Sequence, residues 1–275
     1  MAMHENPGAT FEVEPGVEIY YETRGEGPPL LFIPGWTFTT EVFTHQLAHF
    51  SEAYQVVTYD HRSVGRSTVT PHGNNYVTHG ADLAKLIETL ELEDVVLVGW
   101  SFGCLDAWSY IKQEGLDNVR AMVAIDLSPT PLSTDEDDWV EGPLDEIRVF
   151  YNEFLQSPQG YRDFLTAYIT EVMIQRELEV EELFWLVDQA QKTPYWIAAA
   201  LFASGEFTDH MTEAKKVDAA VPALYVIAEH WAPTAEPFVQ KHLPHTETRV
   251  LGGHMMFWEH ADAFNQILDA FLADL

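Results

Sequence analysis

The stretch VVLVGWSFG at residues 95–103 decides the fold of this chain. Its first four residues are apolar, as in a strand buried within a parallel sheet, and the residues from Phe102 to Lys112 have the pattern of a helix. Between them, Gly-x-Ser-x-Gly places Ser101 on a turn so tight that only small residues fit two positions to either side. Such a turn lifts the hydroxyl above the sheet, near the positive end of the helix. We therefore expect Ser101 to be a nucleophile; the alternative is a glycine-rich turn without chemistry.

Strands and helices alternate on both sides of this stretch. We expect strands at residues 17–23, 30–33, 55–59, 95–98, 119–125, 223–228 and 246–251. We expect helices at residues 77–90, 102–112, 236–242 and 262–272. Strands that alternate with helices imply right-handed crossovers and a mostly parallel sheet. The expected fold class is therefore α/β, with a central sheet flanked by helices.

One long segment interrupts the alternation. From about Leu144 to Met211 the pattern is helical, without a convincing strand, and it is rich in aromatic residues. The acidic run Asp135–Asp138 precedes it and is most simply a solvated loop. We expect residues 131–215 to form a helical cap, and residues 1–130 and 216–275 to form the core.

Composition excludes several classes of function. The chain has 275 residues, 47% of them hydrophobic and 13% aromatic, which suits a large folded domain. Its formal charge of −30 repels phosphate backbones, so we expect no binding to nucleic acid or to anionic membranes. The single cysteine, Cys104, cannot form an intramolecular disulfide, and no secretory or membrane-spanning segment is visible. These features predict a cytoplasmic protein; the acidity suits either an ordinary acidic enzyme or a high-salt environment.

A nucleophilic serine needs a base and a site for the oxyanion. His254 is the candidate base, because it follows an apolar strand in a Gly-Gly-His loop and precedes the last helix. The alternative is a loop histidine without a catalytic role. The early sequence Ile-Pro-Gly-Trp ends at Trp36 directly after a strand. The backbone N–H groups of Trp36 and Phe102 are the expected oxyanion donors.

At these positions the chain resembles the α/β-hydrolase superfamily over nearly its full length. It is particularly similar to the lipase/esterase and cofactor-free haloperoxidase members that carry a helical cap. The matching pieces are the serine turn at 99–103, the Asp-x-Arg-x-x-Gly-x-Ser turn at 60–67, the loop at 253–254, and the cap after the sixth core strand. The resemblance implies a catalytic triad of Ser, His and an acid, or a variant of it. Pro34 and Ser63 depart from the family pattern, which usually has His and Gly there.

The acid of this triad is where the chain departs most from the family pattern. The family usually places it in a turn after the strand at 223–228, where this chain has Trp231. Asp126 is the best substitute, because it follows the strand at 119–125 and both strand ends open onto the same edge of the sheet. Glu229 is the second choice, since its longer side chain would compensate for its distance in sequence from the usual position of the acid. For Asp126 the alternative role is that of a turn-capping residue.

The expected function is that of a serine hydrolase cleaving a carboxylic ester or lactone through an acyl-enzyme on Ser101. We expect Trp36, Trp100, Phe257 and Trp258 to line an apolar substrate pocket. The mechanism needs no metal and no organic cofactor, and the sequence leaves open whether the protein is a monomer or a homodimer. Alternatives on the same scaffold are C–C bond hydrolysis, perhydrolysis and a catalytically silent ligand-binding homologue. A protein that binds a partner through its acidic surface is a further alternative.

Overall fold

A single mixed sheet forms the centre of the protein. The computed structural model describes residues 8–133 and 138–275, so most of the predicted acidic loop, residues 135–137, lies outside the described residues. Across the sheet the strands are β1 (Ala9–Glu14), β2 (Val17–Arg24), β4 (Gln55–Tyr59), β3 (Pro29–Ile33), β5 (Val95–Trp100), β6 (Val119–Ile125), β7 (Ala223–Ile227) and β8 (Glu247–Val250). The pairs β1–β2 and β2–β4 are antiparallel and all other pairs are parallel. This architecture confirms the predicted α/β fold class.

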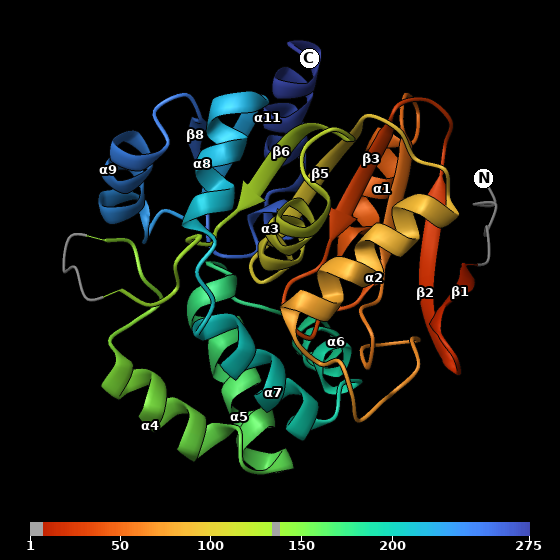
Figure 1. The fold of residues 1–275 in the computed structure, drawn as a ribbon. Helices are drawn as coiled ribbons and strands as arrows, with labels where there is room; N and C mark the ends of the chain where they lie inside the picture. Colours follow the sequence, from red (N-terminus) through yellow and green to blue (C-terminus); the bar gives the residue numbers. More distant parts are fainter. Residues whose placement is uncertain (1–7, 134–137) are drawn as a thin grey trace.

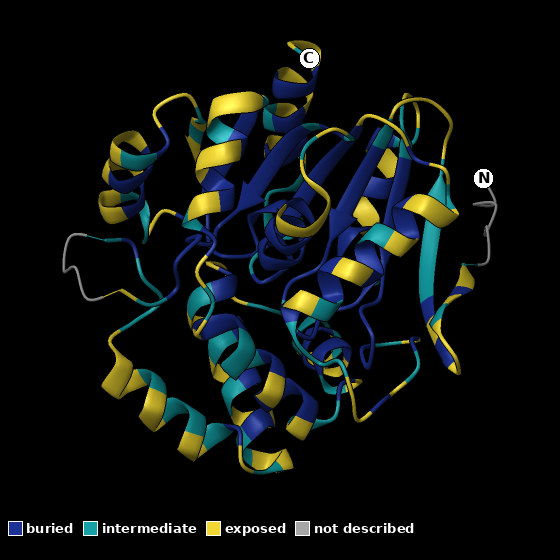
Figure 2. Cartoon of the chain, viewed as in Figure 1, coloured by how far each residue is buried: buried dark blue, intermediate teal, exposed yellow. Residues whose placement is uncertain are grey.

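Helices cover both faces of the sheet (Figure 1). On one face the core contains α2 (Tyr76–Thr89), α3 (Gly103–Glu114), α8 (Met211–Ala220) and α9 (Ala232–His242). The other face is covered by η1 (Thr40–Phe43), α1 (Thr44–Phe50), α10 (Met256–Glu259) and α11 (Ala261–Ala273). Successive residues of a strand point to opposite faces. In β3, accordingly, Leu30 and Phe32 join one core, and Leu31 and Ile33 join the other. Figure 2 shows the central strands buried from end to end.

All helices between β6 and β7 except the last, α8, gather at one edge of the sheet (Figure 1). They are α4 (Leu144–Phe154), α5 (Pro158–Tyr168), the π-helical turn η2 (Ile169–Met173), α6 (Val180–Gln191) and α7 (Tyr195–Glu206). The indole Nε1 of Trp36 donates to the carbonyl of Ala198 in α7 at 2.9 Å, which fastens these helices to the loop after β3. The extent of the cap as residues 131–215 stays a prediction. Helix α8 crosses the expected boundary, and its Ala214 and Val217 belong to the core around α3.

Local patterns predicted the parallel strands well and short elements poorly. The strand at 119–125 and that at 55–59 have the predicted bounds. The structure adds β1, α1 and α10, which were not predicted; α1 and α10 have only seven and four residues. None of the described helices is long and apolar enough to cross a lipid bilayer.

Candidate active site

Ser101 occupies a strained turn between β5 and α3. Its φ is 51°, in the left-handed region that side chains seldom adopt. The flanking glycines make this turn possible, because a Cβ on Gly99 would lie 2.8 Å from Cα of Cys104, and one on Gly103 would lie 2.4 Å from the carbonyl oxygen of Ile33. The turn therefore holds Ser101 at the carboxyl end of β5, as the sequence motif predicts.

Asp126 occupies the matching position at the end of the neighbouring strand. In the parallel register, the last residue of β5 is paired with Ile125, the last residue of β6. Asp126 is also left-handed, with φ 55°, and its N–H donates to the carbonyl of Val226 at 2.9 Å. Its Oδ1 accepts the backbone N–H of Ala228 at 2.7 Å. The carboxylate is thus held at the same edge of the sheet as Ser101.

His254 meets Asp126 at this edge. Nδ1 of the imidazole lies 2.6 Å from Oδ2 of Asp126, and both side chains are buried. The backbone of His254 is fixed from two directions: its N–H donates to the carbonyl of Val172 at 3.2 Å, and its carbonyl accepts the indole N–H of Trp100 at 2.8 Å. Because Trp100 precedes Ser101, the second hydrogen bond joins the histidine loop to the serine turn.

The second candidate for the acid lies elsewhere. Glu229 is exposed, and its Oε2 accepts a hydrogen bond from Nε2 of Gln175 at 3.0 Å. Trp231, which stands where the family usually has its acid, is the N-cap residue of α9, and its ring centroid lies 6.5 Å from that of Trp139. Of the acids considered from the sequence, the structure brings Asp126 and not Glu229 to His254.

The two expected oxyanion donors are available. Among the described residues, no hydrogen bond is donated by the backbone N–H of Trp36 or of Phe102. Trp36 has φ 20°, and its neighbour Gly35 approaches the serine so closely that a Cβ there would lie 2.9 Å from Cβ of Ser101. The loop after β3 and the first residues after the nucleophile therefore meet around Ser101.

A cavity of about 250 Å³ opens against Ser101. Residues from both core loops and the helices between β6 and β7 line it: Gly35, Trp36, Phe38, Trp100, Ser101, Phe102, Glu141, Gly142, Glu146, Ile147, Phe150, Phe164, Tyr168, Met173, Phe202 and Glu206. Its wall is mainly apolar and aromatic, as is typical of small-molecule sites. The predicted pocket residues Trp36 and Trp100 are part of this wall.

The other two predicted pocket residues lie outside it, and the prediction is wrong for them. Phe257 is fully buried in the core, with its ring centroid 4.8 Å from that of Phe43 and 4.9 Å from that of Trp100. Trp258, the next residue of the short helix α10, stacks on Trp185. Their position after His254 made them candidates, but neither ring lines the cavity at Ser101.

Two of the three acids that line the cavity, Glu206 and Glu141, have raised pKa values and were not predicted as site residues. Burial raises the pKa of Glu206 to about 8. Burial also raises the pKa of Glu141 well above its ordinary value, and the negative charges of Glu206 and Asp126 add to the effect. No motif or spacing marks either residue, since their placement depends on how the cap helices pack.

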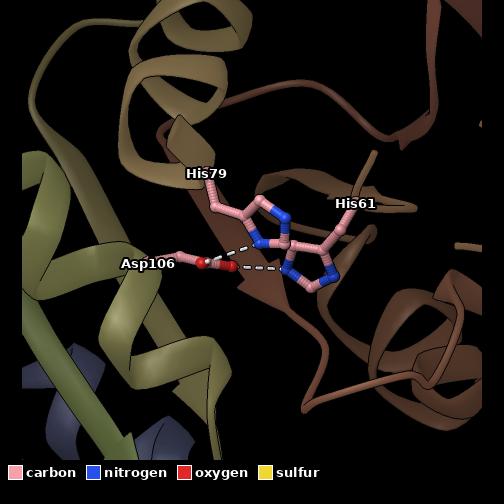
Figure 3. A group of neighbouring side chains, drawn as sticks. All are labelled: His61, His79 and Asp106. Carbon is pink, nitrogen blue, oxygen red and sulfur yellow. Dashed lines mark ion pairs between the residues drawn. The ribbon is translucent and has the colours of Figure 1, made fainter. Parts of the chain in front are cut away.

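Three buried side chains beside α3 offer donor atoms of the type that metals bind. His61 follows β4, His79 lies on α2 and Asp106 on α3, and one donor atom from each lies within 4.8 Å of the others. Figure 3 shows the carboxylate of Asp106 directed at both imidazoles. It contacts Nε2 of His61 and lies 3.3 Å from Nδ1 of His79.

The two histidines of this cluster stabilise the negative charge of Asp106. Burial alone would raise the pKa of Asp106, but His61 and His79 outweigh it and hold that pKa below its ordinary value. A cation would have to displace the contacts that the rings already make with the carboxylate. None of the three residues lines the cavity at Ser101. We therefore interpret the cluster as a buried ion pair that links β4, α2 and α3.

Known proteins share this arrangement of strands and helices. A non-heme chloroperoxidase of Streptomyces lividans is 25% identical in an alignment of 283 positions, which covers 96% of this chain and 99% of the relative. The bromoperoxidase of Bacillus anthracis has a TM-score of 0.86 at 23% identity, over 97% of this chain and 99% of the other. An esterase of Exiguobacterium antarcticum has a TM-score of 0.85 at 21% identity, with the same coverage. The model of the alpha/beta hydrolase fold family matches residues 28–261, and this chain therefore belongs to that family.

Proposed function

We propose that this protein is a serine hydrolase that cleaves a carboxylic ester or lactone of a mainly apolar small molecule. The observation that carries the proposal is the contact of 2.6 Å between Nδ1 of His254 and Oδ2 of Asp126. It lies at the sheet edge where the strained turn presents Ser101 to a cavity. An imidazole that donates from Nδ1 to a carboxylate has Nε2 free to accept a proton.

The first half of the reaction forms an acyl-enzyme. Oγ of Ser101 attacks the carbonyl carbon while its proton passes to Nε2 of His254. The negative charge that develops on the carbonyl oxygen is stabilised by the N–H groups of Trp36 and Phe102. The C–O bond to the alcohol then breaks, and the imidazolium returns the proton to the leaving oxygen.

The second half regenerates the serine. Water gives its proton to Nε2 of His254 and attacks the acyl carbon, and the ester bond to Oγ of Ser101 breaks. The proton then passes back to Oγ, and a carboxylic acid is released. Asp126 stays ionised throughout, because its role is to orient the imidazole and to stabilise its charged form.

Covalent labelling with a small fluorophosphonate, read by intact mass, tests this function. We expect the wild type to gain one adduct per chain and Ser101→Ala to gain none. Ser109→Ala is the control, because Ser109 lies buried on α3, the helix that follows the serine turn, and does not line the cavity. Turnover of activated esters that is lost in Ser101→Ala would then exclude a silent ligand-binding protein and a protein that only binds partners.

Perhydrolysis is the second candidate, favoured by the name of a bifunctional esterase/perhydrolase of Acinetobacter calcoaceticus that is 31% identical over 117 residues, which covers 42% of each chain. In this reaction hydrogen peroxide takes the place of water, attacks the acyl carbon on Ser101 and leaves as a peracid. Peracid formation that competes with ester hydrolysis at millimolar peroxide would support it. Hydrolysis that is unaffected by peroxide, with no peracid detected, would leave the esterase function alone.

A further inference from the structure

Three glutamates line the cavity and have no part in the proposed reaction. Glu146 is exposed on helix α4, whereas Glu206 is buried and Glu141 is half-buried. Glu206 ends helix α7, and Glu141 lies in the segment that leads from β6 into α4. The residue before Glu206 is Gly205, where a Cβ would lie 2.6 Å from the ring of Phe102. Because Phe102 follows the nucleophile, this contact places the end of α7 directly beside the serine turn.

Glu206 lacks a compensating partner. Its side chain is 2% exposed, and its Oε2 is buried without a hydrogen-bond partner among the described residues. No lysine or arginine is among the described residues that line the cavity. No basic group offsets the effect of burial on the pKa of Glu206 or of Glu141. The site therefore has acceptor groups for a cation and no cation of its own.

The rest of the wall suits an organic cation. Eight aromatic residues line the cavity, from the loop after β3, the serine turn and the cap helices: Trp36, Phe38, Trp100, Phe102, Phe150, Phe164, Tyr168 and Phe202. Aromatic rings attract cations to their faces, most strongly where water is excluded. The alkyl substituents of an organic ammonium group pack against the rings while its charge interacts with the carboxylates. A small metal ion would interact with the carboxylates alone.

The charge of the whole protein acts in the same direction. With 44 acidic and 14 basic residues the chain has a formal charge of −30. A field of this sign raises the local concentration of cations and lowers that of anions. Long-range attraction and the carboxyl groups of the cavity thus favour the same charge on a ligand.

We propose that Glu206, together with Glu141, binds an ammonium group, so that the substrate is an ester or lactone carrying a protonated or quaternary amine. This inference rests on the proposed function and specifies its substrate class. The competing role for these residues is that of neutral carboxylic acids that donate hydrogen bonds to an oxygen of an uncharged substrate.

Two esters of the same shape separate the two roles. Choline acetate and 3,3-dimethylbutyl acetate differ in one atom, a quaternary nitrogen against a quaternary carbon. We expect the wild type to have the higher kcat/KM for choline acetate, by about tenfold. In Glu206→Gln, which keeps the size of the side chain, we expect the ratio of the two values to fall to about one.

Glu153→Gln is the matched control. It makes the same change of side chain at an exposed position on α4 that does not line the cavity. We expect the substrate ratio of this variant to equal that of the wild type. A ratio that falls equally in Glu153→Gln and Glu206→Gln would overturn the proposal, because the preference would then come from the overall charge.

A binding experiment does not depend on turnover. Trp36 and Trp100 line the cavity, so their fluorescence reports its occupation. We expect choline to bind more tightly than 3,3-dimethylbutan-1-ol, its uncharged isostere, and Glu206→Gln to remove the difference.

The outcomes of the two experiments are distinguishable. If choline binds selectively but fluorophosphonate does not label Ser101, the hydrolase function fails and the ammonium site stands. The opposite result is that Ser101 is labelled, that the enzyme hydrolyses 3,3-dimethylbutyl acetate at least as well as choline acetate, and that choline does not bind more tightly than its isostere. In that case the ammonium site is overturned and the hydrolase function stands. A preference for the uncharged ester that Glu206→Gln abolishes would assign Glu206 to hydrogen-bond donation instead.

Discussion

Oδ2 of Asp126 and Nδ1 of His254 lie 2.6 Å apart although 128 positions of sequence separate them. The other carboxylate oxygen accepts the backbone N–H of Ala228 at 2.7 Å, so the acid is fixed from two sides. Ala228 directly follows β7, the strand after which the family usually places its acid. The backbone at the end of β7 thus orients a carboxylate that the neighbouring strand β6 supplies.

Replacement of Asp126 by Asn tests this orientation. The amide keeps an oxygen for Ala228 but no longer favours the imidazole tautomer with its proton on Nδ1, so Nε2 loses its ability to accept the proton of Ser101. We expect kcat for an activated ester to fall by roughly 10³- to 10⁴-fold. Initial rates at saturating substrate and the rate of fluorophosphonate labelling measure the loss.

Glu229→Gln is the control for this prediction. Glu229 is exposed and contacts Gln175, so we expect its kcat to stay within about twofold of the wild type. The assignment of the acid would be wrong if Glu229→Gln were the damaging variant and Asp126→Asn kept most of its activity.

The sequence was informative where local patterns set the chemistry. The serine turn requires glycines at fixed positions, and Asp126 follows an apolar run that is typical of a parallel strand, so both could be located without the structure. The meeting of Asp126 and His254 was also predictable in outline, because parallel strands end at one edge of the sheet. The choice between Asp126 and Glu229 needed the structure, since it depends on the direction of one loop.

The cavity could not be predicted from the sequence, because the spacing of apolar residues within one helix does not show how that helix packs against the others. Phe257 follows the catalytic loop closely in sequence, yet its ring fills the core against Phe43 and Trp100. Glu206 lies at the end of a mainly apolar helix, and its sequence neighbours do not indicate burial beside Ser101. Both positions are consequences of tertiary packing.

Gly35→Ala tests the close approach of the oxyanion loop to the nucleophile. An added Cβ would lie 2.9 Å from Cβ of Ser101 and 3.1 Å from the carbonyl oxygen of Trp100, so the loop has to shift. A shift moves the N–H of Trp36 away from the developing oxyanion, and we expect kcat to fall by roughly 10²-fold. Because ground-state contacts lie mostly elsewhere in the cavity, KM should change much less. A kcat equal to that of the wild type would show that Trp36 supplies no oxyanion donor.

Asp106→Asn tests the buried cluster with His61 and His79. Removing a carboxylate that is enclosed by its partners leaves the imidazoles without compensation, and we expect the free energy of unfolding at pH 7 to fall by about 3 kcal/mol. The pKa of Asp106 is lowered in the folded state, so its contribution is present above the pKa of the unfolded chain and is lost as pH falls through the folded value. Urea unfolding at pH 7 and at about pH 4 measures both effects.

Asp94→Asn provides the comparison, because Asp94 pairs with Arg120 at the surface. We expect its cost to be within about 0.5 kcal/mol. Equal destabilisation by the two variants would show that the buried cluster contributes no more than a surface pair.

Glu206→Gln should stabilise the protein increasingly as pH rises. Burial raises the pKa of Glu206 to about 8, so between its ordinary value of 4.5 and about 8 the unfolded chain loses a proton that the folded protein keeps. The free energy of unfolding of the wild type therefore falls with rising pH across this window. The variant has no such group, and we expect it to gain little near pH 4 and on the order of 4 kcal/mol by pH 9.

Chemical unfolding of the two proteins at pH 4, 6, 8 and 9 measures this difference. Glu141, Tyr76 and Tyr168 are present in both proteins, but the charge of Glu206 helps to raise the pKa of each of them. The difference therefore measures the replaced carboxyl together with its coupling to these three groups. Saturating choline should reduce the gain at pH 9, because an ammonium group beside Glu206 favours its ionised form in the wild type. A gain that is the same at every pH would mean that Glu206 titrates alike in the folded and unfolded states, and that burial does not hold its proton.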